Sequence, residues 1–419
     1  MYILYFQTVL LIFFAGIKFK IDSCAMILKY SRTVWKIISL YLRLNKLPAV
    51  FGFAILVYHG FFFAMPAVSA AVLQISCGGF HCLVLESDGT VWAWGQNTYG
   101  QLGDGTNIDR KLPVLVKGLD NVTAIAGGIW HSIALKADGT AWAWGGNWAG
   151  QLGTGSTKSS NIPVQVKGLA DVTAIACKGQ HSLIIKSDGT VWSWGRNAYG
   201  QLGDGTNTDK NTPVQVRQLS GIVSIAAGGY HSFAQKADGT IWAWGLNTHG
   251  QLADGSITNR ITPVPISGFR DVRVINCGGD HCIALKNDGT VWTWGLNQCG
   301  QLGDGSANNR STPFPVNTFD NVAAVAGGGD HSIALKSDGT VWAWGSNSFG
   351  QLGDGTLANR ERPVMVKTLN KVISVSAGSQ HNLALKTDGT LWAWGLNKNG
   401  QIGEGTNTNK NTPVQVKIK

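Results

Sequence analysis

The sequence predicts an all-β protein, a seven-bladed β-propeller of four-stranded antiparallel blades, preceded by an N-terminal apolar targeting segment. The first observation behind this prediction is a 50-residue period that recurs seven times and fills residues 70–419. Repeats of this length are typical of propeller blades. The second is that each repeat contains four short β-rich segments separated by turn residues, which is the number of strands in one blade.

The period is set by residues that return at the same place in each repeat. A His is followed by Asp-Gly, then by Trp-x-Trp-Gly, then by Asn-x-x-Gly-Gln, and a Pro precedes the last apolar segment. The histidines are His81, His131, His181, His231, His281, His331 and His381. The repeats therefore run over 70–119, 120–169, 170–219, 220–269, 270–319, 320–369 and 370–419.

The second repeat shows how four strands are predicted. The segment 122–126 is rich in β-formers, 131–137 alternates polar and apolar residues, and 141–145 is a third strand. Asp138-Gly139 predicts a two-residue hairpin with a type I′ turn, which needs positive φ at both positions. The segment 163–166 starts with Pro, as an outer edge strand would.

The paired tryptophans have a packing explanation. Trp142 and Trp144 are two residues apart, so they face the same side of the sheet, and the residue between them is Ala143. A large side chain on one blade facing a small one on the next fits packing between sheets. The sequence therefore favours a core position for these tryptophans over ligand stacking.

Residues 1–70 form a separate segment, predicted to be a basic region with a signal peptide or membrane anchor. They carry seven basic residues and one acid, so much of the net charge of +10 lies outside the propeller of 71–419. The remaining charges are nearly balanced, which gives little support for nucleic-acid binding.

The apolar run 49–72 follows Arg43 and Lys46 and ends in small residues. This order predicts a secretory signal cleaved after Ala70, with an uncleaved membrane anchor as the alternative. Both place the propeller outside the cytoplasm: secreted, periplasmic or at the cell surface. A start codon assigned too early, with Met26 as the true start, is a further alternative, and a cytoplasmic location would follow if the segment is misassigned.

The segment Ile125–Leu135 and its counterparts, with the motif D-G-T-x-W-x-W-G-x-N-x-x-G-Q-L-G, resemble the regulator-of-chromosome-condensation repeat family. The resemblance covers 72–419, recurs seven times and implies a seven-bladed propeller, here in an exported bacterial-type member. Departures from the pattern are few: Lys178 and Ser379 each replace a Gly, and Thr154 replaces an Asp.

No motif in the sequence indicates an enzyme, a cofactor or a metal. Seven histidines at one position per blade are spaced around a ring, and a zinc ion needs ligands about 2.0–2.3 Å away, so a repeated hydrogen-bonding role is expected instead. The Gly-rich loops lack the Lys-Ser/Thr of a phosphate-binding loop. No nucleophile elbow, HExxH motif or singular acidic pair is present.

Two cysteine pairs are candidates for disulfides. Cys77/Cys82 and Cys277/Cys282 each flank the first hairpin of a blade within CGGxHC. Cross-strand neighbours at that spacing permit a disulfide, and an exported protein favours one. The alternative is that each Cys is a small buried residue, because Gly127 or Ala227 takes the same place elsewhere.

Positions at which the blades differ are the candidate site. The residue before each His varies and is expected on one rim of the propeller, with an aromatic arc and an acidic arc. The predicted partner-binding rim is Phe80, Trp130, Gln180, Tyr230, Asp280, Asp330 and Gln380. A second variable ring follows each Trp-Gly: Tyr99, Ala149, Tyr199, His249, Cys299, Phe349 and Asn399.

These observations favour a monomeric, extracytoplasmic protein-binding scaffold that recognises its partner through one rim. It would be similar in kind to the secreted propeller of this family that inhibits β-lactamases. The resemblance also implies an alternative, a guanine-nucleotide exchange factor for a small GTPase, with Asp280 and Asp330 as contact residues. A carbohydrate or cell-wall binding module is a second alternative, since aromatic side chains also stack on sugars.

Overall fold

The computed structural model describes residues 71–317 and 319–418 of the chain. The predicted targeting segment and its cleavage site after Ala70 lie outside the described residues. Within the described ranges, no helix is long and apolar enough to cross a bilayer.

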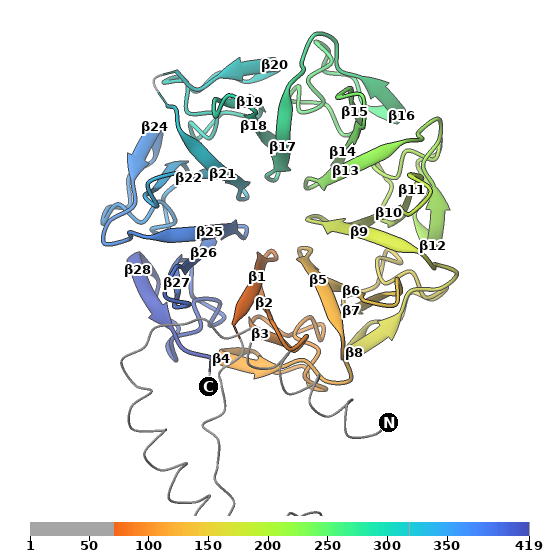
Figure 1. Ribbon diagram of the computed structural model, residues 1–419, viewed down its shortest axis with the longest axis horizontal. Coiled ribbons are helices and arrows are strands. Elements are labelled where there is room, and N and C mark those ends of the chain that lie inside the picture. The colour runs from red at the N-terminus through yellow and green to blue at the C-terminus, as the bar shows by residue number, and fades with distance from the viewer. Residues whose placement is uncertain (1–70, 318, 419) are drawn as a thin grey trace, which may run out of the picture. The chain divides into compact units, whose positions relative to one another are not determined.

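Seven four-stranded antiparallel sheets are arranged as blades around a central hub (Figure 1). Blade 1 contains β1 (Val72–Cys77), β2 (His81–Glu86), β3 (Val91–Gly95) and β4 (Arg110–Leu115). Blade 2 contains β5 (Val122–Gly127), β6 (His131–Lys136), β7 (Ala141–Gly145) and β8 (Ser160–Gln165). Blade 3 contains β9 (Val172–Cys177), β10 (His181–Lys186), β11 (Val191–Gly195) and β12 (Lys210–Gln215). Blade 4 contains β13 (Ile222–Ala227), β14 (His231–Lys236), β15 (Ile241–Gly245) and β16 (Arg260–Pro265).

Blade 5 contains β17 (Val272–Cys277), β18 (His281–Lys286), β19 (Val291–Gly295) and β20 (Arg310–Pro315). Blade 6 contains β21 (Val322–Gly327), β22 (His331–Lys336), β23 (Val341–Gly345) and β24 (Arg360–Met365). Blade 7 contains β25 (Val372–Ala377), β26 (His381–Lys386), β27 (Leu391–Gly395) and β28 (Lys410–Val416). In every blade the strands pair in chain order, so each blade is made from one repeat, and none of the described strands is shared between the first and last blades. The predicted fold class is confirmed.

Two details of the predicted strands are wrong. The fourth strand begins earlier than expected, so Pro163 lies inside β8 and not at its start. Its pairing with β7 shifts register between Ala143 and Gly145, and an irregular outer edge does not need the N–H that Pro lacks.

The Asp-Gly hairpin is also longer than a two-residue turn. Gly139 has a positive φ of 77°, but Asp138 does not. The Gly139 amide donates to the Lys136 carbonyl at 3.0 Å, and the Asp138 carboxylate accepts the amide of Thr140 at 2.9 Å. The connection is therefore a wider turn closed by the carboxylate, and not a type I′ turn.

The blades pack through the second tryptophan of each pair. Trp144 is fully buried and contacts the apolar cluster of the preceding blade, which includes Ala93 and Leu102. This confirms the expected packing of a large side chain on a small one. The first tryptophan, Trp142, is half-buried and donates through Nε1 to Thr140 at 3.1 Å, so only the second of each pair is a full core residue.

A ring of polar contacts joins the same interfaces. The His81 imidazole lies 2.8 Å from Ser132 Oγ of the next blade, and that hydroxyl donates to the Gln101 carbonyl at 2.8 Å. Because the Ser proton is used on Gln101, His81 Nε2 carries the proton and donates to Ser132. Trp144 Nε1 donates to the same carbonyl at 2.9 Å. The predicted structural role of the histidines, as repeated hydrogen-bonding residues, is confirmed.

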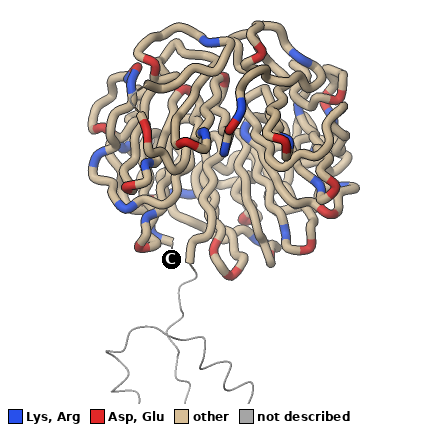
Figure 2. The backbone as a smooth tube through the Cα atoms, turned by 45° about the horizontal axis from the view of Figure 1, so that its top comes forward, with Lys and Arg blue, Asp and Glu red and all other residues tan. Residues whose placement is uncertain are grey.

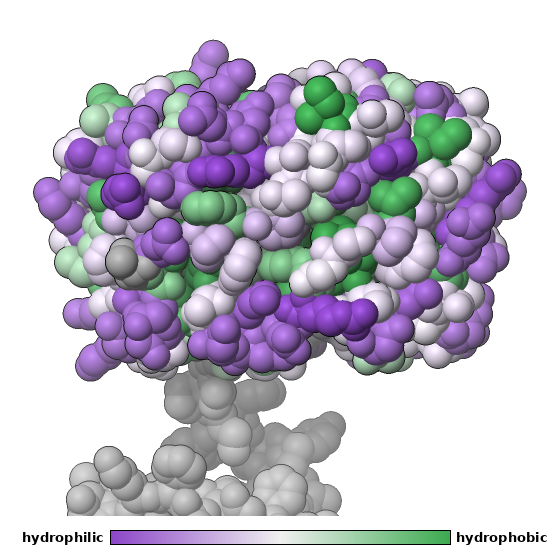
Figure 3. Space-filling view, turned by 90° about the horizontal axis from the view of Figure 1, so that it is seen from above, coloured by the Kyte–Doolittle hydropathy of each residue, from purple (hydrophilic) through white to green (hydrophobic). Residues whose placement is uncertain are grey.

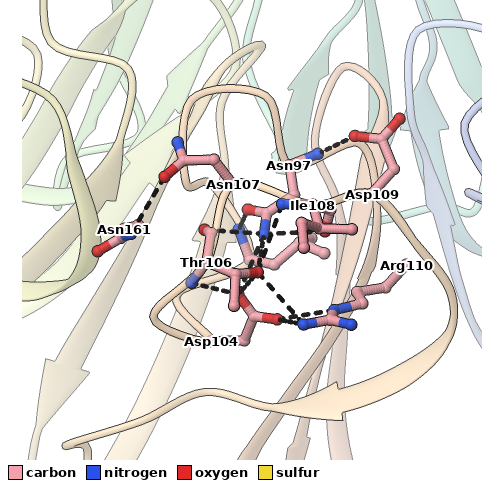
Figure 4. A network of polar contacts seen from close by, with 9 residues as sticks. Asn97, Asp104, Thr106, Asn107, Ile108, Asp109, Arg110 and Asn161 are labelled. Carbon is pink, nitrogen blue, oxygen red and sulfur yellow. Dashed lines mark hydrogen bonds and ion pairs between the residues drawn. The ribbon is translucent and has the colours of Figure 1, made fainter.

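The Gly-rich loop after each third strand is tied together by one asparagine (Figure 4). Asn97 Nδ2 donates to Asp104 and to the carbonyls of Thr106 and Ile108, each at 3.1 Å. Its Oδ1 accepts the amide of Leu102 at 2.9 Å. Arg110 Nε donates to Asp104 at 2.8 Å. Most of this motif therefore serves the fold, and the loop is held rigidly enough to present its exposed side chains.

Candidate functional site

One face of the propeller carries two sets of loops from every blade, and we call it the loop face. The 78–80 loop of blade 1 joins β1 to β2, and the 96–109 loop joins β3 to β4. The two lie together, because the Gln96 amide donates to the Phe80 carbonyl at 2.9 Å. The same bond recurs in other blades, for example from Leu296 to Asp280. Both variable rings of the sequence therefore lie on the loop face.

The two rings interlock between neighbouring blades. Tyr99 of blade 1 contacts Trp130 of blade 2 edge-on, with ring centroids 5.6 Å apart, and Phe80 stacks on Trp130 at 5.1 Å. Tyr199 of blade 3 contacts Tyr230 of blade 4 in the same way at 5.4 Å. A residue of the second ring thus meets the first-ring residue of the following blade, and the two rings form one surface.

Trp148 belongs to this surface, although the sequence analysis missed it. Its ring lies 4.9 Å from that of Tyr99, and its Nε1 donates to Gln180 at 3.2 Å. A Cβ at position 146 would overlap the Trp148 ring, and Gly146 leaves the space free. The signal in the sequence is that Trp130 and Trp148 are the propeller tryptophans outside the seven Trp-x-Trp-Gly pairs.

We call Phe80, Tyr99, Trp130, Trp148, Tyr199 and Tyr230 the aromatic arc. Its outer members remain accessible: the exposed fractions are 38% for Tyr99, 41% for Trp148 and 37% for Tyr199. The structure brings together the predicted aromatic residues of blades 1 and 2, and it places Tyr230 in a separate pair with Tyr199. Gln180 lies beside Trp148, which extends the arc across blade 3.

The acidic side of the loop face lies over blades 5 and 6. Gln251 Nε2 donates to Asp280 at 3.3 Å, and Asp330 is exposed. Loss of hydration in this crowded region and the neighbouring Asp280 carboxylate raise the pKa of Asp330. Gln380 is half-buried on blade 7. The predicted aromatic and acidic arcs therefore occupy separate parts of one face.

Charge and hydropathy elsewhere are mixed. Lys and Arg are interspersed with Asp and Glu over the propeller, among many uncharged residues (Figure 2). The side view shows mostly hydrophilic residues with separate hydrophobic ones among them (Figure 3). The contacts between rings distinguish the aromatic arc from the scattered apolar residues: four of its members are connected, and Tyr199 and Tyr230 form a pair.

The hub contains one departure from the repeat, Lys178. A cavity of about 260 Å³ is lined by residues of the inner strands, including Cys177, Lys178, Asn276 and Cys277. Lys178 Nζ crosses the hub and donates to the carbonyls of Gly327 at 2.5 Å and Ala377 at 2.8 Å. Burial lowers the pKa of Lys178 to about 8.

The two predicted cysteine pairs differ in state. Cys77 and Cys82 form a disulfide between β1 and β2. Cys277 and Cys282 are free thiols whose sulfurs lie 3.0 Å apart. Cys177 and Cys299 are also free.

Comparison with known proteins now identifies the family. The model of the RCC1-like domain matches residues 61–221 and 262–419, more than half of the chain. This chain belongs to the RCC1-like domain family. Models of the regulator of chromosome condensation (RCC1) repeat match 222–251 and 238–285 in addition.

Curated relatives match short parts of this RCC1-like chain. The human E3 ubiquitin-protein ligase HERC2 is 39% identical over 59 residues, which are 14% of this chain and 1% of the ligase. The ultraviolet-B receptor UVR8 of Arabidopsis thaliana is 44% identical over 48 residues, 12% of this chain and 11% of the receptor. The chain therefore covers a small part of each relative.

Solved structures match over the whole propeller. Prp20p of Saccharomyces cerevisiae, the yeast RCC1, has a TM-score of 0.71 at 26% identity, covering 84% of this chain and 87% of Prp20p. Its crystal structure is reported with its binding properties to Gsp1p and histones. A further crystal structure shows Kap60 bound to it.

Proposed function

We propose that this propeller is a non-catalytic binding platform that recognises a protein partner through the loop face. The observation that carries the proposal is the aromatic arc, where Tyr99 contacts both Trp130 and Trp148 and all three side chains are partly exposed. Large aromatic side chains on a rigid frame are frequent anchors of protein interfaces. The yeast relative, for which protein partners are reported, supports a protein ligand.

The aromatic and acidic side chains of the loop face indicate which groups a complementary partner would present. Apolar side chains are expected opposite the aromatic arc, and a basic group is expected opposite Asp280 and Asp330. We propose that the chain acts outside the cytoplasm, as its apolar, basic-flanked N-terminal run suggests, with membrane contact only through that run if it stays uncleaved.

Truncation of the accessible aromatics tests the proposal. The full chain is crosslinked in its own cells, the captured protein is identified, and its affinity is measured by calorimetry. In the variant Tyr99→Ala/Trp148→Ala/Tyr199→Ala, binding is expected to weaken by at least about 2 kcal/mol, because buried aromatic anchors contribute that much. These side chains are partly exposed, so the fold should remain intact.

The matched control is Leu73→Ala/Val223→Ala/Ile373→Ala. These three apolar residues are more exposed than the aromatic arc, at 62%, 61% and 54%. They lie near the starts of the inner strands, at the end away from the loop face. Equal loss in both variants, or retained affinity in the first, would reject the loop face as the interface.

The likeness to Prp20p supports guanine-nucleotide exchange on a small GTPase as a second candidate. It predicts that the chain accelerates release of a fluorescent GDP analogue from a small GTPase, and that Asp280→Ala/Asp330→Ala slows this release. Cell fractionation separates the two candidates: the full-length chain in the cytosol favours exchange and contradicts an exported platform. Retention on cell-wall polysaccharide without a protein ligand would favour the carbohydrate alternative.

A further inference from the structure

The junction of blades 4 and 5 departs from the repeated contact between histidine and serine. In blades 2, 3, 4 and 6, the second residue of the second strand is a serine that bridges a histidine and a carbonyl. Ser232, for example, lies 2.9 Å from His181 Nε2 and 2.9 Å from the Gln201 carbonyl. In blade 5 this residue is Cys282, whose sulfur lies 3.0 Å from His231 Nε2 but 3.9 Å from the Gln251 carbonyl.

Sulfur in place of the serine oxygen weakens the hydrogen bond from residue 282 to the Gln251 carbonyl, a bond that stabilises the fold at the junctions where this residue is a serine. A thiol is a weaker donor than a hydroxyl, and 3.9 Å is long compared with the 2.8–3.2 Å of the serines. Stability of the interface therefore does not explain Cys282. A second replacement accompanies it, because Cys277 occupies the place of Ala227 and pairs with Cys282 across the hairpin.

We propose that Cys277, Cys282 and His231 form a binding site for a thiophilic d10 metal ion, Zn²⁺ or Cu⁺. The Sγ atoms of the cysteines and a ring nitrogen of the histidine all lie within 4.8 Å of one another, and all three residues are buried. Thiolate and imidazole are the ligands these ions favour. The proposal revises the expectation of no metal, which considered histidines alone.

The geometry accommodates an ion after a small opening. Two sulfurs bound at about 2.3 Å with a tetrahedral angle lie about 3.8 Å apart, and the present Sγ–Sγ distance is 3.0 Å. On binding, each thiol loses its proton to solvent and forms one metal–sulfur bond. His231 binds the ion through Nε2, the nitrogen that faces Cys282, in the tautomer that carries its proton on Nδ1, and a fourth position remains for water.

The two thiolates balance the charge of the two ions differently. Two thiolates neutralise Zn²⁺, so little net charge is buried. With Cu⁺ one negative charge remains, and Lys178 is close enough to Cys277 for their charges to interact. Cys277 lines the cavity of the hub, which offers a route by which an ion could reach the site.

Blade 1 supplies an internal comparison. Cys77, Cys82 and His381 form the equivalent group, with Cys82 Sγ 3.2 Å from His381 Nε2. Their sulfurs are joined in a disulfide, which removes both thiolates from metal binding. The junction of blades 4 and 5 has the same three residue types with both thiols free.

The test uses the full chain and variants that copy blade 4, where Ala227 and Ser232 take the two places. The variant Cys77→Ala/Cys82→Ser removes the blade 1 pair, so that Cys277, Cys282 and His231 remain as the candidate metal site. The additional changes Cys277→Ala/Cys282→Ser remove both groups and keep Cys24, Cys177 and Cys299. Zn²⁺ and Cu⁺ are each presented to the reduced protein under argon, in competition with a chromophoric chelator, and Co²⁺ is used as a spectroscopic probe.

The first variant is expected to bind one equivalent of Zn²⁺ or Cu⁺, and the ion bound more tightly identifies the ligand. Its Co²⁺ form should show a sulfur-to-metal charge-transfer band. In the same background, His231→Gln should weaken binding more than about tenfold, because even outer-shell partners contribute that much. Equal binding by the variant that lacks both cysteine pairs would overturn the proposal, as would a Cys277–Cys282 disulfide in freshly isolated, argon-handled protein.

Discussion

His81 and His331 act as neutral hydrogen-bond donors. His331 Nε2 lies 2.7 Å from the Asn382 amide oxygen, which can only accept, while the Asn382 nitrogen donates to the Gln351 carbonyl at 2.7 Å. His331 therefore has its proton on Nε2, as His81 has. Within the described residues, Nδ1 of both rings is buried without a hydrogen-bond partner, so protonation there gains no contact.

This arrangement predicts loss of stability in mild acid. Burial lowers the pKa to about 3 for His81, His181, His281 and His381 and to about 4 for His131 and His331. In the unfolded chain these residues bind protons near pH 6.5, so the free energy of unfolding is highest above that pH. It should fall as the pH decreases from 6.5 towards 4, by up to about 1.4 kcal/mol per pH unit for each histidine. Denaturant unfolding at pH 7, 6 and 5 measures the slope.

A single histidine variant checks the cause. In His131→Gln one titrating group is removed and an Nε2 donor is retained, so the slope should decrease by about 1.4 kcal/mol per pH unit. The carboxylates with lowered pKa values, such as Asp104, lose their contribution only below their ordinary pKa of 3.8. A free energy of unfolding independent of pH between 7 and 5 would contradict the role assigned to the histidines.

At the scale of the element, blade 2 lacks an ion pair that the other blades have. Asp304 and Arg310 form this pair in blade 5 at 2.7 Å, with the Asp304 side chain almost fully buried. Blade 2 has Thr154 and Ser160 at these places. We predict that Thr154→Asp/Ser160→Arg raises the free energy of unfolding by about 1 kcal/mol. A hydrogen bond between two charged groups is strong, but solvent weakens this one because the arginine is partly exposed.

A double-mutant cycle separates the pair from its parts. Thr154→Asp alone can accept a hydrogen bond from Asn147, as Asp104 accepts one from Asn97, and Ser160→Arg alone lacks the carboxylate of the ion pair. The stability of the double variant should therefore exceed the sum of the single changes. Simple additivity in denaturant unfolding would show that the loop does not form the contact seen in blade 5.

The strands could be predicted because each repeat contains its own turn residues and alternation. Details that depend on contacts with neighbouring strands could not be predicted from the sequence. The place of Pro163 depends on how the outer strand pairs with β7, and the width of the Asp138 turn depends on the contact between its carboxylate and Thr140. Both are results of local geometry that the residue types alone leave open.

For the whole molecule, the sequence identified the variable residues but not their arrangement. Tyr99 and Trp130 are 31 positions apart and meet because loops of adjacent blades overlap. Lys178 contacts Gly327 and Ala377 across the hub, half a ring away. A repeat pattern predicts the strands and turns within one blade, whereas these contacts depend on how the seven blades are placed around the ring.

Closure uses the same contacts at the first and last blades as elsewhere. Trp94 Nε1 donates to the Gln401 carbonyl at 3.0 Å, as Trp144 does to Gln101. The Gly405 amide donates to the Lys111 carbonyl at 2.9 Å, as Gly105 does to Asn161. The junction therefore has no special strand, and the position of the chain break should have little effect on the ring.

A circular permutant tests this directly. Val72 and Ile418 pack against one apolar cluster, so a short Gly-Ser linker can join residue 418 to residue 71, with new ends opened at Gly118 between blades 1 and 2. The permutant keeps every interface and closes a loop of similar length, which costs little entropy. We expect the native circular dichroism spectrum, one cooperative transition and a free energy of unfolding within about 1 kcal/mol of the parent. Separate melting of blade 1 in the permutant would show instead that its covalent link to blade 2 holds it in the ring.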